Sequence, residues 1–508
     1  MRIRRLSAVL AAIAVAGCAR LPDPVERAQS TAFTDTANTR LGRTLAPMVA
    51  ANPGKTGVYV LSGARDAFAA RVLLARGAER GLDVQYYIWR ADTTGRLLGD
   101  ELWQAAERGV RVRLLLDDAN TRGLDEALVV LDAHPNIEVR LFNPFANRGF
   151  RLGDLVADFS RVNRRMHNKS FIADNQLAIV GGRNVGDEYF GTDTIGEFAD
   201  LDTLAAGAVV TDVSREFDLY WNSASAYPVA SLVGAVDPAR AGQLRALWSK
   251  VGEGADAVRY VEAVRDTPLL KHLLAGALPL EWASAHVVAD DPAKVLRDTA
   301  REGMLPRLTA ALGKPERELD LVSPYFVPTE DGVSTLRTLV ESGVKVRVLT
   351  NSLSATDVSP VHAGYAKYRE ELLKAGVKLY EMRPVSEMKR EHGGSSASSG
   401  GQLHAKTFGV DRSRIFVGSF NLDPRSAHLN TEMGVVYESP VLAARLARVF
   451  DKPDPGAAYE LRRTANGGIE WIERTAAGEQ RFTTDPETSV WRRMWVGFLS
   501  WLPIEWLL

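Results

Sequence analysis

Two stretches of this chain, residues 166–184 and 403–421, align without a gap and constrain the fold more than any other feature. They share the pattern H-x-K-x4-D-x6-G-[GS]-x-N, and each shared position is displaced by 237 residues. The shared residues are His167, Lys169, Asp174, Gly181 and Asn184 in the first copy, and His404, Lys406, Asp411, Gly418 and Asn421 in the second. Because the chain has only 8 histidines, two at matching positions indicate an internal duplication rather than chance.

Three further phrases recur in the same order, at offsets between 234 and 240 residues. They are 107–118 with 341–352, 82–89 with 319–326, and 137–144 with 377–384. Several of them are apolar enough for buried strands and are separated by amphipathic stretches, a pattern typical of an α/β sheet that is largely parallel in this part of the chain. We therefore expect two homologous α/β lobes that face each other about a pseudo-twofold axis.

The N-terminus has the layout of an export signal, with three arginines, an apolar stretch and then small residues. Residues 15–18 resemble the lipobox of bacterial lipoproteins, in which the cysteine is lipidated, and Cys18 is the only cysteine of the chain. We expect a lipid-anchored protein of the bacterial cell envelope on a periplasm-facing membrane. Because no aspartate follows Cys18, the outer membrane is favoured. A plain signal peptide or an uncleaved anchor with an incidental cysteine is the alternative.

The C-terminal part of the chain is rich in tryptophan, with five of the ten in the last 38 residues. Pro503 and Glu505 interrupt the apolar segment 490–508, so it is not expected to span a bilayer. It fits either an interfacial segment at headgroup depth or a helix docked on the protein's own core. The arginine-rich stretch 148–165 favours contacts with lipid phosphates, with a solvated charged face as the alternative.

Six segments are expected along the chain. They are a lipoprotein signal peptide (1–17), a tether (18–54), the first lobe (55–225), a helical connector (226–290), the second lobe (291–455) and a Trp-rich C-terminal extension (456–508), for which a membrane-interfacial role is one of the two alternatives given above.

The repeated H-x-K pattern has a chemical meaning when it lies on an extended strand. Side chains alternate along a strand, so the imidazole and the ammonium group project from the same face. Two such lobes brought together would surround one space with two imidazoles, two ammonium groups and two carboxamides. Such a space could bind a phosphodiester, with a nucleophile on one side and an acid on the other.

These motifs resemble those of the phospholipase D superfamily, which carries paired HKD motifs. The resemblance covers both lobes and implies two phospholipase D-type α/β/α sandwich lobes. It is nearest to the bacterial cardiolipin synthase C-like phosphatidyltransferases, over residues 86–118, 198–222 and 323–336.

The family resemblance also implies a role for each site residue. His167 is interpreted as the nucleophile that forms a phosphohistidine and His404 as the general acid, although the near-symmetric repeat also allows the reverse. Phosphate oxygens would be held by Lys169, Lys406, Asn184 and Asn421, with Ser419 as a further candidate. One orienting carboxylate is expected behind each histidine, Asp200 in the first lobe and Glu432 in the second. Asp174 and Asp411 are interpreted as structural, and no metal or other cofactor is needed.

The implied reaction transfers a phosphatidyl group from a phospholipid, phosphatidylethanolamine or phosphatidylglycerol, to phosphatidylglycerol, which gives cardiolipin. Hydrolysis of phospholipids to phosphatidate is the main alternative, because water can replace the acceptor hydroxyl. A secreted nuclease or a non-catalytic envelope lipoprotein is less favoured: the formal net charge of -1 does not indicate a nucleic-acid partner, and both motifs are intact. A monomer associated with the membrane is expected, because one chain carries both motifs.

Overall fold

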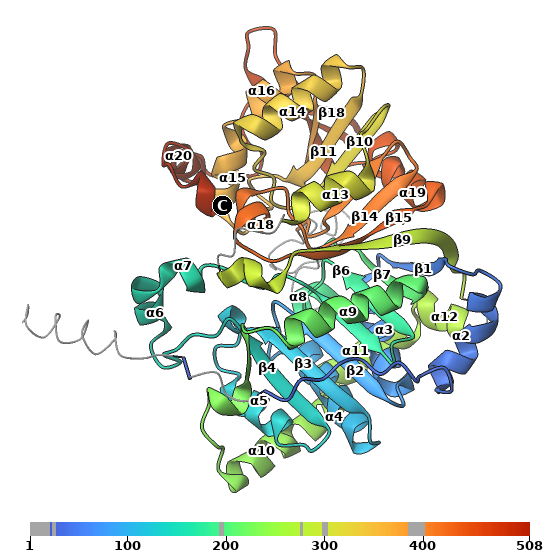
Figure 1. The fold of residues 1–508 in the computed structure, drawn as a ribbon. Helices are drawn as coiled ribbons and strands as arrows, with labels where there is room; N and C mark the ends of the chain where they lie inside the picture. Colours follow the sequence, from blue (N-terminus) through green and yellow to red (C-terminus); the bar gives the residue numbers. More distant parts are fainter. Residues whose placement is uncertain (1–20, 23–26, 193–197, 275–277, 297–302, 385–401) are drawn as a thin grey trace, which may run out of the picture.

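The computed structural model describes residues 21–22, 27–192, 198–274, 278–296, 303–384 and 402–508. Cys18 and the predicted signal peptide lie outside these residues. Figure 1 shows two lobes stacked on each other, the first below and the second above, and the prediction of two α/β lobes is confirmed.

The first lobe is built on one mixed sheet of eight strands. Its strands are β1 (Thr56–Leu61), β2 (Gly81–Tyr86), β3 (Arg111–Asp117), β4 (Ile137–Phe142), β5 (Ser170–Ala173), β6 (Leu177–Gly181), β7 (Asp202–Gly207) and β8 (Ala226–Pro228). They are ordered β8–β4–β3–β2–β5–β6–β7–β1, with β2, β3 and β4 parallel and every other pairing antiparallel.

The second lobe repeats this order and extends it. Its strands are β9 (Glu281–Ala289), β10 (Glu318–Val322), β11 (Lys345–Asn351), β12 (Lys378–Met382), β13 (Thr407–Val410), β14 (Arg414–Gly418), β15 (Met433–Glu438), β16 (Ala458–Arg463), β17 (Ile469–Thr475) and β18 (Gly478–Phe482). The order is β18–β17–β16–β12–β11–β10–β13–β14–β15–β9, and only β10, β11 and β12 are parallel.

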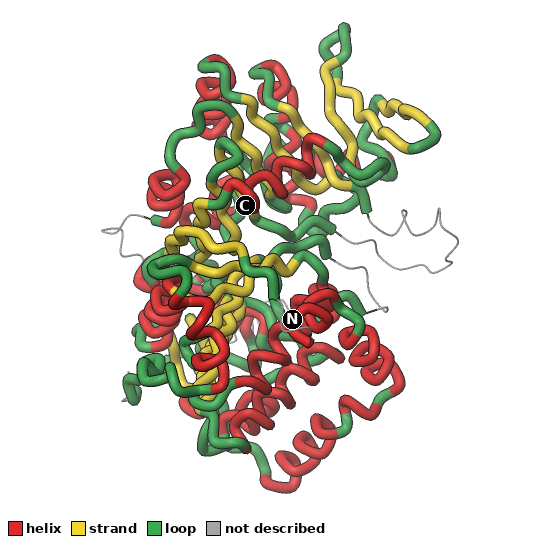
Figure 2. The backbone as a smooth tube through the Cα atoms, turned by 90° about the vertical axis from the view of Figure 1, so that its right-hand side faces the viewer, coloured by secondary structure: helices red, strands yellow, loops and turns green. Residues whose placement is uncertain are grey.

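Helices lie on the outer faces of both sheets, as Figure 2 shows in red around the yellow strands. In the first lobe and its flanks they are α2 (Arg40–Ala50), α3 (Ala64–Gly77), α4 (Thr93–Glu107), η1 (Asp118–Asn120), α5 (Asp125–Asp132), α6 (Arg151–Ala157), α7 (Phe159–Val162), α8 (Asp187–Phe190), α9 (Ala208–Trp221) and η2 (Val229–Ser231). The part of the sequence that connects the two lobes holds α10 (Pro238–Ser249), η3 (Val251–Glu253), α11 (Ala255–Arg265), α12 (Pro268–Leu274) and η4 (Pro292–Leu296). The second lobe and the C-terminal region hold α13 (Met304–Leu312), α14 (Thr329–Glu341), α15 (Ser359–Ala366), α16 (Arg369–Lys374), α18 (Pro424–His428), α19 (Pro440–Asp451), α20 (Val490–Leu499) and η5 (Glu505–Leu507).

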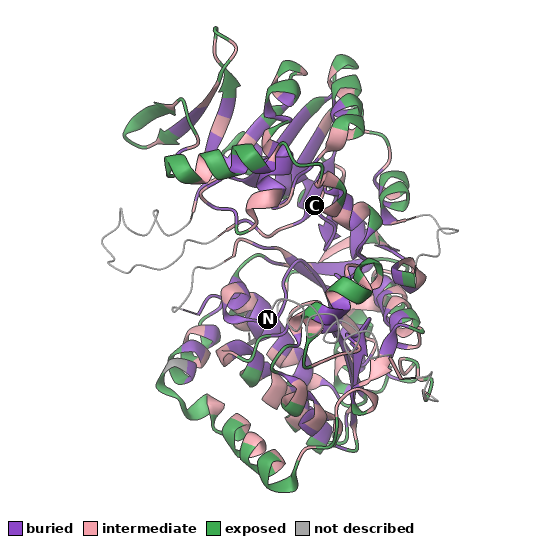
Figure 3. Cartoon of the chain, turned by 90° about the vertical axis from the view of Figure 1, so that its left-hand side faces the viewer, coloured by how far each residue is buried: buried purple, intermediate pink, exposed green. Residues whose placement is uncertain are grey.

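The central strands are buried on both faces because helices cover them, which explains why their sequences are nearly continuous apolar runs. Figure 3 shows these strands in purple, inside helices whose outer faces are exposed. One large apolar cluster lies within each lobe, and a third large one contains side chains of both lobes, for example Met166 and Leu403. The two lobes therefore share part of their core.

A buried charge cluster is also duplicated between the sheet and one helix of each lobe. Arg113 on β3 pairs with Asp83 at 2.6 Å and with Asp218 of α9 at 2.7 Å, and its guanidinium lies 4.8 Å from the ring of Phe217. In the second lobe the corresponding partners of Arg347 on β11 are Asp320 and Asp451, both at 2.6 Å, and the ring of Phe450, at 4.8 Å. These contacts align α9 with α19 at an offset of 233 residues.

Three of the expected segment boundaries need correction. The segment 226–290 is not only helical: β8 still pairs with β4, and β9 pairs with β1 at one end and with β15 at the other, which joins the two sheets. Strands β16 to β18, placed in the C-terminal extension, continue the second sheet beyond β12. The described part of the expected tether is bound to the first lobe, because the carboxylate of Asp218 accepts the backbone N–H of Ala32 at 3.0 Å.

Candidate active site

The two motif histidines lie on short extended segments that cross to the opposite lobe. The segment before His167 forms a parallel bridge between Met166 and Thr431, and the segment before His404 forms one between Ala199 and Leu403. The backbone N–H of His167 donates to Thr431 O at 2.8 Å, and that of His404 donates to Ala199 O at 2.8 Å. Each motif is thus fixed to the backbone of the other lobe.

Two residues that the sequence analysis did not single out hold these segments from within their own lobes. The carboxylate of Asp117, at the end of β3, accepts the N–H of Met166 at 2.8 Å. The amide of Asn351, at the end of β11, both accepts from and donates to the backbone of Leu403, at 2.9 and 3.0 Å. Both residues could have been found from the repeated phrases 107–118 and 341–352. Each is a polar residue at the end of a parallel strand, and the two positions correspond.

Each imidazole is paired with a carboxylate that comes from the other lobe. Nδ1 of His167 lies 2.8 Å from Oε2 of Glu432, and Nδ1 of His404 lies 2.5 Å from Oδ2 of Asp200. The sequence analysis expected one carboxylate per lobe but not this exchange between lobes. With Nδ1 bonded to a carboxylate, Nε2 of each ring is the nitrogen left for chemistry.

The two carboxylates have different surroundings, although the lobes are related. Both oxygens of Glu432 accept serine hydroxyls, Ser419 Oγ at 2.5 Å and Ser426 Oγ at 2.9 Å. The residue corresponding to Ser419 is Gly182, where an added Cβ would lie 2.2 Å from Oδ1 of Asp200. The first lobe therefore needs a glycine at this position. Ser419 binds the orienting carboxylate, which is a different contact from the phosphate contact expected of it.

Burial and charge set the ionisation of these four groups. Burial, followed by the charges of Lys169 and Lys406, holds the pKa of His167 well below its usual range, and burial lowers the pKa of His404 to about 4. Burial raises the pKa of Glu432 to about 7. It would also raise the pKa of Asp200, but contact with His404 and the nearby Lys406 keeps that pKa below its usual range.

Both motif lysines are buried, and each is 1% exposed. Nζ of Lys169 donates to the carbonyl oxygen of His167 at 2.5 Å, and Nζ of Lys406 donates to that of His404. Burial lowers the pKa of Lys169 well below its usual range and that of Lys406 to about 8. An ammonium group has three N–H donors, so each lysine keeps donors for an anion after its backbone contact.

The motif asparagines are also buried beside the histidines. The side-chain oxygen of Asn184 accepts the N–H of Ile88 at 3.2 Å, and its nitrogen donates to Tyr189 Oη at 3.0 Å, which leaves one amide hydrogen. The side-chain oxygen of Asn421 is buried and has no hydrogen-bond partner in the part of the chain that the structure describes. This oxygen of Asn421 is therefore an acceptor that a donor group of a ligand could use.

Aromatic side chains enclose the two imidazoles. The ring of Tyr87 packs edge-on against His167 at 5.0 Å between centroids, and Tyr189 does the same against His404 at 5.2 Å. Phe198 stacks on His404 at 5.4 Å. These contacts restrict the ring orientations and keep the site away from bulk water. Nothing in the sequence singled these residues out, since aromatic side chains are common in protein cores and are not specific to a site.

Asp174 and Asp411 of the motifs lie at β-turns and do not bond to the histidines. Both have positive φ, 52° and 53°, in the turns that join β5 to β6 and β13 to β14. The carboxylate of Asp174 accepts three backbone N–H groups, from Glu79 at 3.0 Å, Arg80 at 2.8 Å and Gly81 at 3.0 Å. Asp411 accepts the corresponding three from residues 316–318. Each carboxylate fixes the entry to the neighbouring parallel strand.

The C-terminal helix α20 is docked on the protein and exposed at the same time. Val496 and Leu499 pack against Leu353 and Ala363 of the second lobe. Four large apolar side chains face solvent and are called here the aromatic face: Trp491 (78% exposed), Trp495 (54%), Phe498 (56%) and Trp501 (89%). Among the described residues, none of the helices combines the length and apolar character that crossing a bilayer requires.

The end of the chain lies beside the segment that leads into the first motif. Arg425 donates to Leu507 O at 3.0 Å and to Asn163 O at 3.0 Å, and α6, α7 and α20 lie on the same side of the molecule in Figure 1.

The arginines of 148–165 are largely engaged by the protein itself: Arg148 pairs with Asp118 at 2.9 Å and Arg165 with Asp117 at 3.3 Å. The expected role of this stretch in lipid binding therefore has little support in the structure.

Comparison with known proteins gives a consistent result across the two lobes. Residues 74–221 and 308–453 each match the family described as "Cardiolipin synthase, PLD-like domain". The chain is 47% identical to cardiolipin synthase C of Escherichia coli (strain K12) over 474 residues, which are 92% of this chain and 100% of that protein. It is 26% identical to the major cardiolipin synthase ClsA of Bacillus subtilis over 394 residues, 77% of this chain and 68% of that one.

Among solved structures, the chain resembles a phosphatidylserine synthase of Haemophilus influenzae Rd KW20, with a TM-score of 0.52. This similarity covers 84% of this chain and 92% of the other at 14% sequence identity, and it supports the fold alone.

Proposed function

The chain belongs to the cardiolipin synthases of the phospholipase D superfamily and is a phosphatidyltransferase, and we propose that it makes cardiolipin from phosphatidylglycerol and a second phospholipid. The relative with the higher identity is a cardiolipin synthase matched over its whole length. Phosphatidylethanolamine is the proposed donor, with phosphatidylglycerol as the other candidate.

The observation that carries this proposal is the pair of carboxylate-bound imidazoles beside two buried ammonium groups. Nε2 of His167 attacks the phosphorus of the donor lipid, and the bond from phosphorus to the headgroup oxygen breaks as Nε2–H of His404 protonates that oxygen. His404 then takes the proton of the terminal glycerol hydroxyl of phosphatidylglycerol. That hydroxyl oxygen attacks the phosphorus, the bond from phosphorus to His167 breaks, and cardiolipin leaves.

The lysines supply the electrostatic part of this mechanism. Lys169 and Lys406 bind the non-bridging oxygens, which gain charge as the phosphorus becomes five-coordinate. Their buried positions strengthen this attraction, because the local dielectric constant is low.

The different carboxylates support the proposed roles of the two histidines. The charge of the ionised Asp200 opposes the effect of burial on the pKa of His404, which favours the protonated ring that an acid needs. Glu432 has a pKa near 7 and accepts two serine hydroxyls, so it stabilises positive charge on His167 less than Asp200 does on His404. This suits a neutral nucleophile.

Transfer competes with hydrolysis for the same phosphohistidine, because water can take the place of the acceptor. The aromatic enclosure by Tyr87, Tyr189 and Phe198 favours transfer by limiting the access of water. The protein is proposed to act as a monomer, since one chain supplies both halves of the site.

Attachment to the membrane is proposed to use two elements. The lipobox-like residues 15–18 indicate acylation of Cys18 in the cell envelope, on a periplasm-facing and preferably the outer membrane. The aromatic face would rest at headgroup depth, where tryptophan is favoured.

The activity can be tested with the purified full-length protein in vesicles of phosphatidylethanolamine and phosphatidylglycerol, followed by mass spectrometry of the lipids. Cardiolipin together with free ethanolamine supports the proposed reaction, and cardiolipin with free glycerol identifies phosphatidylglycerol as the donor. Phosphatidate without cardiolipin would show a hydrolase instead. The His167→Ala/His404→Ala protein serves as the control for contaminating enzymes.

A further inference from the structure

A cavity of about 670 Å³ lies where the second lobe meets the first, and the proposed reaction does not use it. Most of its lining belongs to the second lobe, between the sheet and α19, and includes Val322, Leu349, Met382, Ile415, Leu446 and Phe450. Val60 and residues 199–201 of the first lobe also line it. This volume is within the range of about 300–1,000 Å³ that is usual for ligand sites. Most of its lining residues are apolar.

The cavity lies on the opposite face of the motif strand from the catalytic side chains. Leu403, Ala405 and Thr407 line it, whereas His404 and Lys406 project to the other side because side chains alternate along a strand. Asp200 is shared, since it lines the cavity and also binds Nδ1 of His404. An occupant of the cavity would therefore be a molecule other than the phosphodiester under attack, yet next to a residue that positions His404.

Comparison of the two lobes explains why the space is open. The buried positions of α9 and α19 correspond one to one at an offset of 233: Val209, Val210, Val213, Ser214 and Phe217 match Leu442, Ala443, Leu446, Ala447 and Phe450. The first lobe continues with Tyr220 and Trp221, which are fully buried, and Trp221 stacks on Phe217 at 5.8 Å. The second lobe has Pro453 and Asp454 at these positions, and both line the cavity.

The loss of two aromatic side chains thus leaves a space in one lobe that the other lobe fills. Tightly packed interiors rarely keep so large an apolar void empty, because its lining loses contacts on one side. The chain after α19 could carry aromatic residues at the positions that match Tyr220 and Trp221 of α9, but it does not. The open space is therefore a specific feature of the second lobe.

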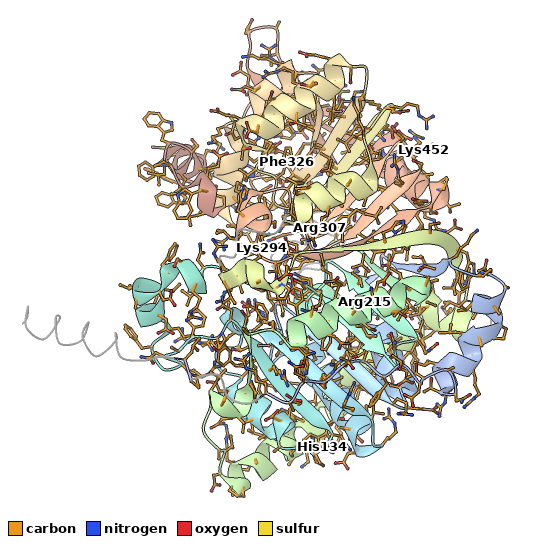
Figure 4. The ribbon with its side chains drawn as sticks, viewed as in Figure 1. His134, Arg215, Lys294, Arg307, Phe326 and Lys452 are labelled. Atoms are coloured by element: carbon orange, nitrogen blue, oxygen red, sulfur yellow. The ribbon has the colours of Figure 1, made fainter. Side chains whose placement is uncertain are left out.

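The mouth of the cavity is exposed and positively charged. Val449, 46% exposed, and the exposed Lys452 and Asp454 lie at the end of α19, and Figure 4 places Lys452 at the outer edge of the second lobe. Arg445 also lines the cavity. Within the described residues, the side chains of Arg445 and Lys452 make no hydrogen bond and no ion pair, although the backbone N–H of Lys452 donates to Arg448 O at 2.9 Å. Two cations therefore outnumber one carboxylate at the opening of an apolar cavity.

We infer that this cavity is a second lipid site, which takes an acyl chain of an anionic phospholipid and places its phosphate near Arg445 and Lys452. The apolar walls fit the chain, and the charged mouth fits the headgroup. The choice of a phospholipid rests on the function proposed above, which places the protein among such lipids.

The site can be tested with full-length protein in vesicles that contain phosphatidylglycerol with a photoreactive diazirine on its acyl chain. Labelling is done in the His167→Ala protein, so that the probe is not converted, and cross-linked peptides are identified by mass spectrometry. We expect labels on residues 442–458. Absence of labels from this segment would overturn the inference, as would labelling by free diazirine palmitate but not by the phospholipid.

Two sets of variants make the test specific. Asp454→Trp restores the residue of the first lobe, and Ala457→Phe fills the cavity from another wall; each should reduce labelling at least tenfold, whereas Val441→Trp on the exposed side of α19 should not. Arg445→Glu/Lys452→Glu should remove the preference for phosphatidylglycerol over a phosphatidylcholine probe, with Arg448→Glu as the matched control. Equal labelling of the filled variants and the parent would contradict the site.

Measuring cardiolipin formation by the parent protein in the same vesicles separates this inference from the proposed function. Labelling of the cavity without cardiolipin formation would overturn the proposed reaction but support the lipid site. Cardiolipin formation without labelling of the cavity would support the proposed reaction and overturn the lipid site.

Discussion

The carboxylate of Glu432 in the second lobe lies 2.8 Å from Nδ1 of His167 in the first lobe. The same relationship joins Asp200 and His404 in the other direction, at 2.5 Å. Neither lobe therefore contains a complete histidine–carboxylate pair, and both pairs exist only when the lobes are docked.

Neutralising either carboxylate should slow catalysis while the fold is kept. We expect Glu432→Gln and Asp200→Asn each to lower kcat by about 10²- to 10⁴-fold, the range seen when the carboxylate behind a catalytic histidine loses its charge. Cardiolipin formation in vesicles measures the effect. Glu438→Gln is the matched control, because Glu438 faces the exposed His286 at 3.9 Å outside the site and should leave activity unchanged.

The two histidines should differ in their effect on the covalent intermediate. With a phosphatidyl ester of p-nitrophenol, whose leaving group needs no acid, His404→Ala should still accumulate an acid-labile phosphoenzyme, whereas His167→Ala should form none. Phosphorus NMR and intact-protein mass spectrometry detect the adduct. An adduct in His167→Ala but not in His404→Ala would reverse the assigned roles.

The pH profile should have two limbs set by Glu432 and Lys406. Burial raises the pKa of Glu432 to about 7, so kcat/KM should fall below this pH as the carboxylate gains a proton and loses its hold on His167. Burial lowers the pKa of Lys406 to about 8, so activity should also fall above this pH as the ammonium group loses its charge.

Lys406→Arg separates the two limbs, because a guanidinium stays charged over this range. We expect its alkaline limb to move to higher pH, while the acid limb stays in place, even if the maximal rate is lower. An unchanged alkaline limb in this variant would exclude Lys406 as its origin.

Asp174 should contribute to stability rather than to chemistry. Its carboxylate accepts three backbone N–H groups at a residue with φ of 52°, so Asp174→Ala loses the acceptors and adds backbone strain. We expect a loss of about 2–4 kcal/mol in the free energy of unfolding, measured by urea denaturation, and a smaller loss of about 1 kcal/mol for Asp174→Asn. The exposed Asp212→Ala is the control, and a large drop in the activity of folded Asp174→Asn would contradict a structural role.

Membrane attachment should need both proposed elements to be removed. Cys18→Ser should release only part of the protein into the soluble fraction, because the aromatic face keeps some affinity for the membrane. Adding Trp491→Ser and Trp495→Ser should release the rest, whereas Leu247→Ser, at an exposed residue of α10 on the first lobe, should not. Retention of the triple variant on membranes would show that another surface binds them.

Much of the site could be predicted from the sequence because its determinants are local. An H-x-K segment puts histidine and lysine on one face of a strand wherever that strand lies, and the repeat at one offset requires two such strands. Asp174 and Asp411 follow the same logic, since a carboxylate in a tight turn bonds to nearby backbone N–H groups. The α/β class of each lobe was also implied by the alternation of apolar runs and helices.

The duplication, the α/β lobes and the identity of the motif residues could thus be inferred from the chain alone, because these depend on periodicity and spacing along one segment. Three features became visible only in the folded molecule: Glu432 pairs with His167 and Asp200 with His404, α20 buries one side and exposes the other, and Pro453 and Asp454 leave a cavity open. These features arise where segments far apart in the chain meet. The contacts there depend on how two surfaces dock, and no single stretch of sequence contains that information.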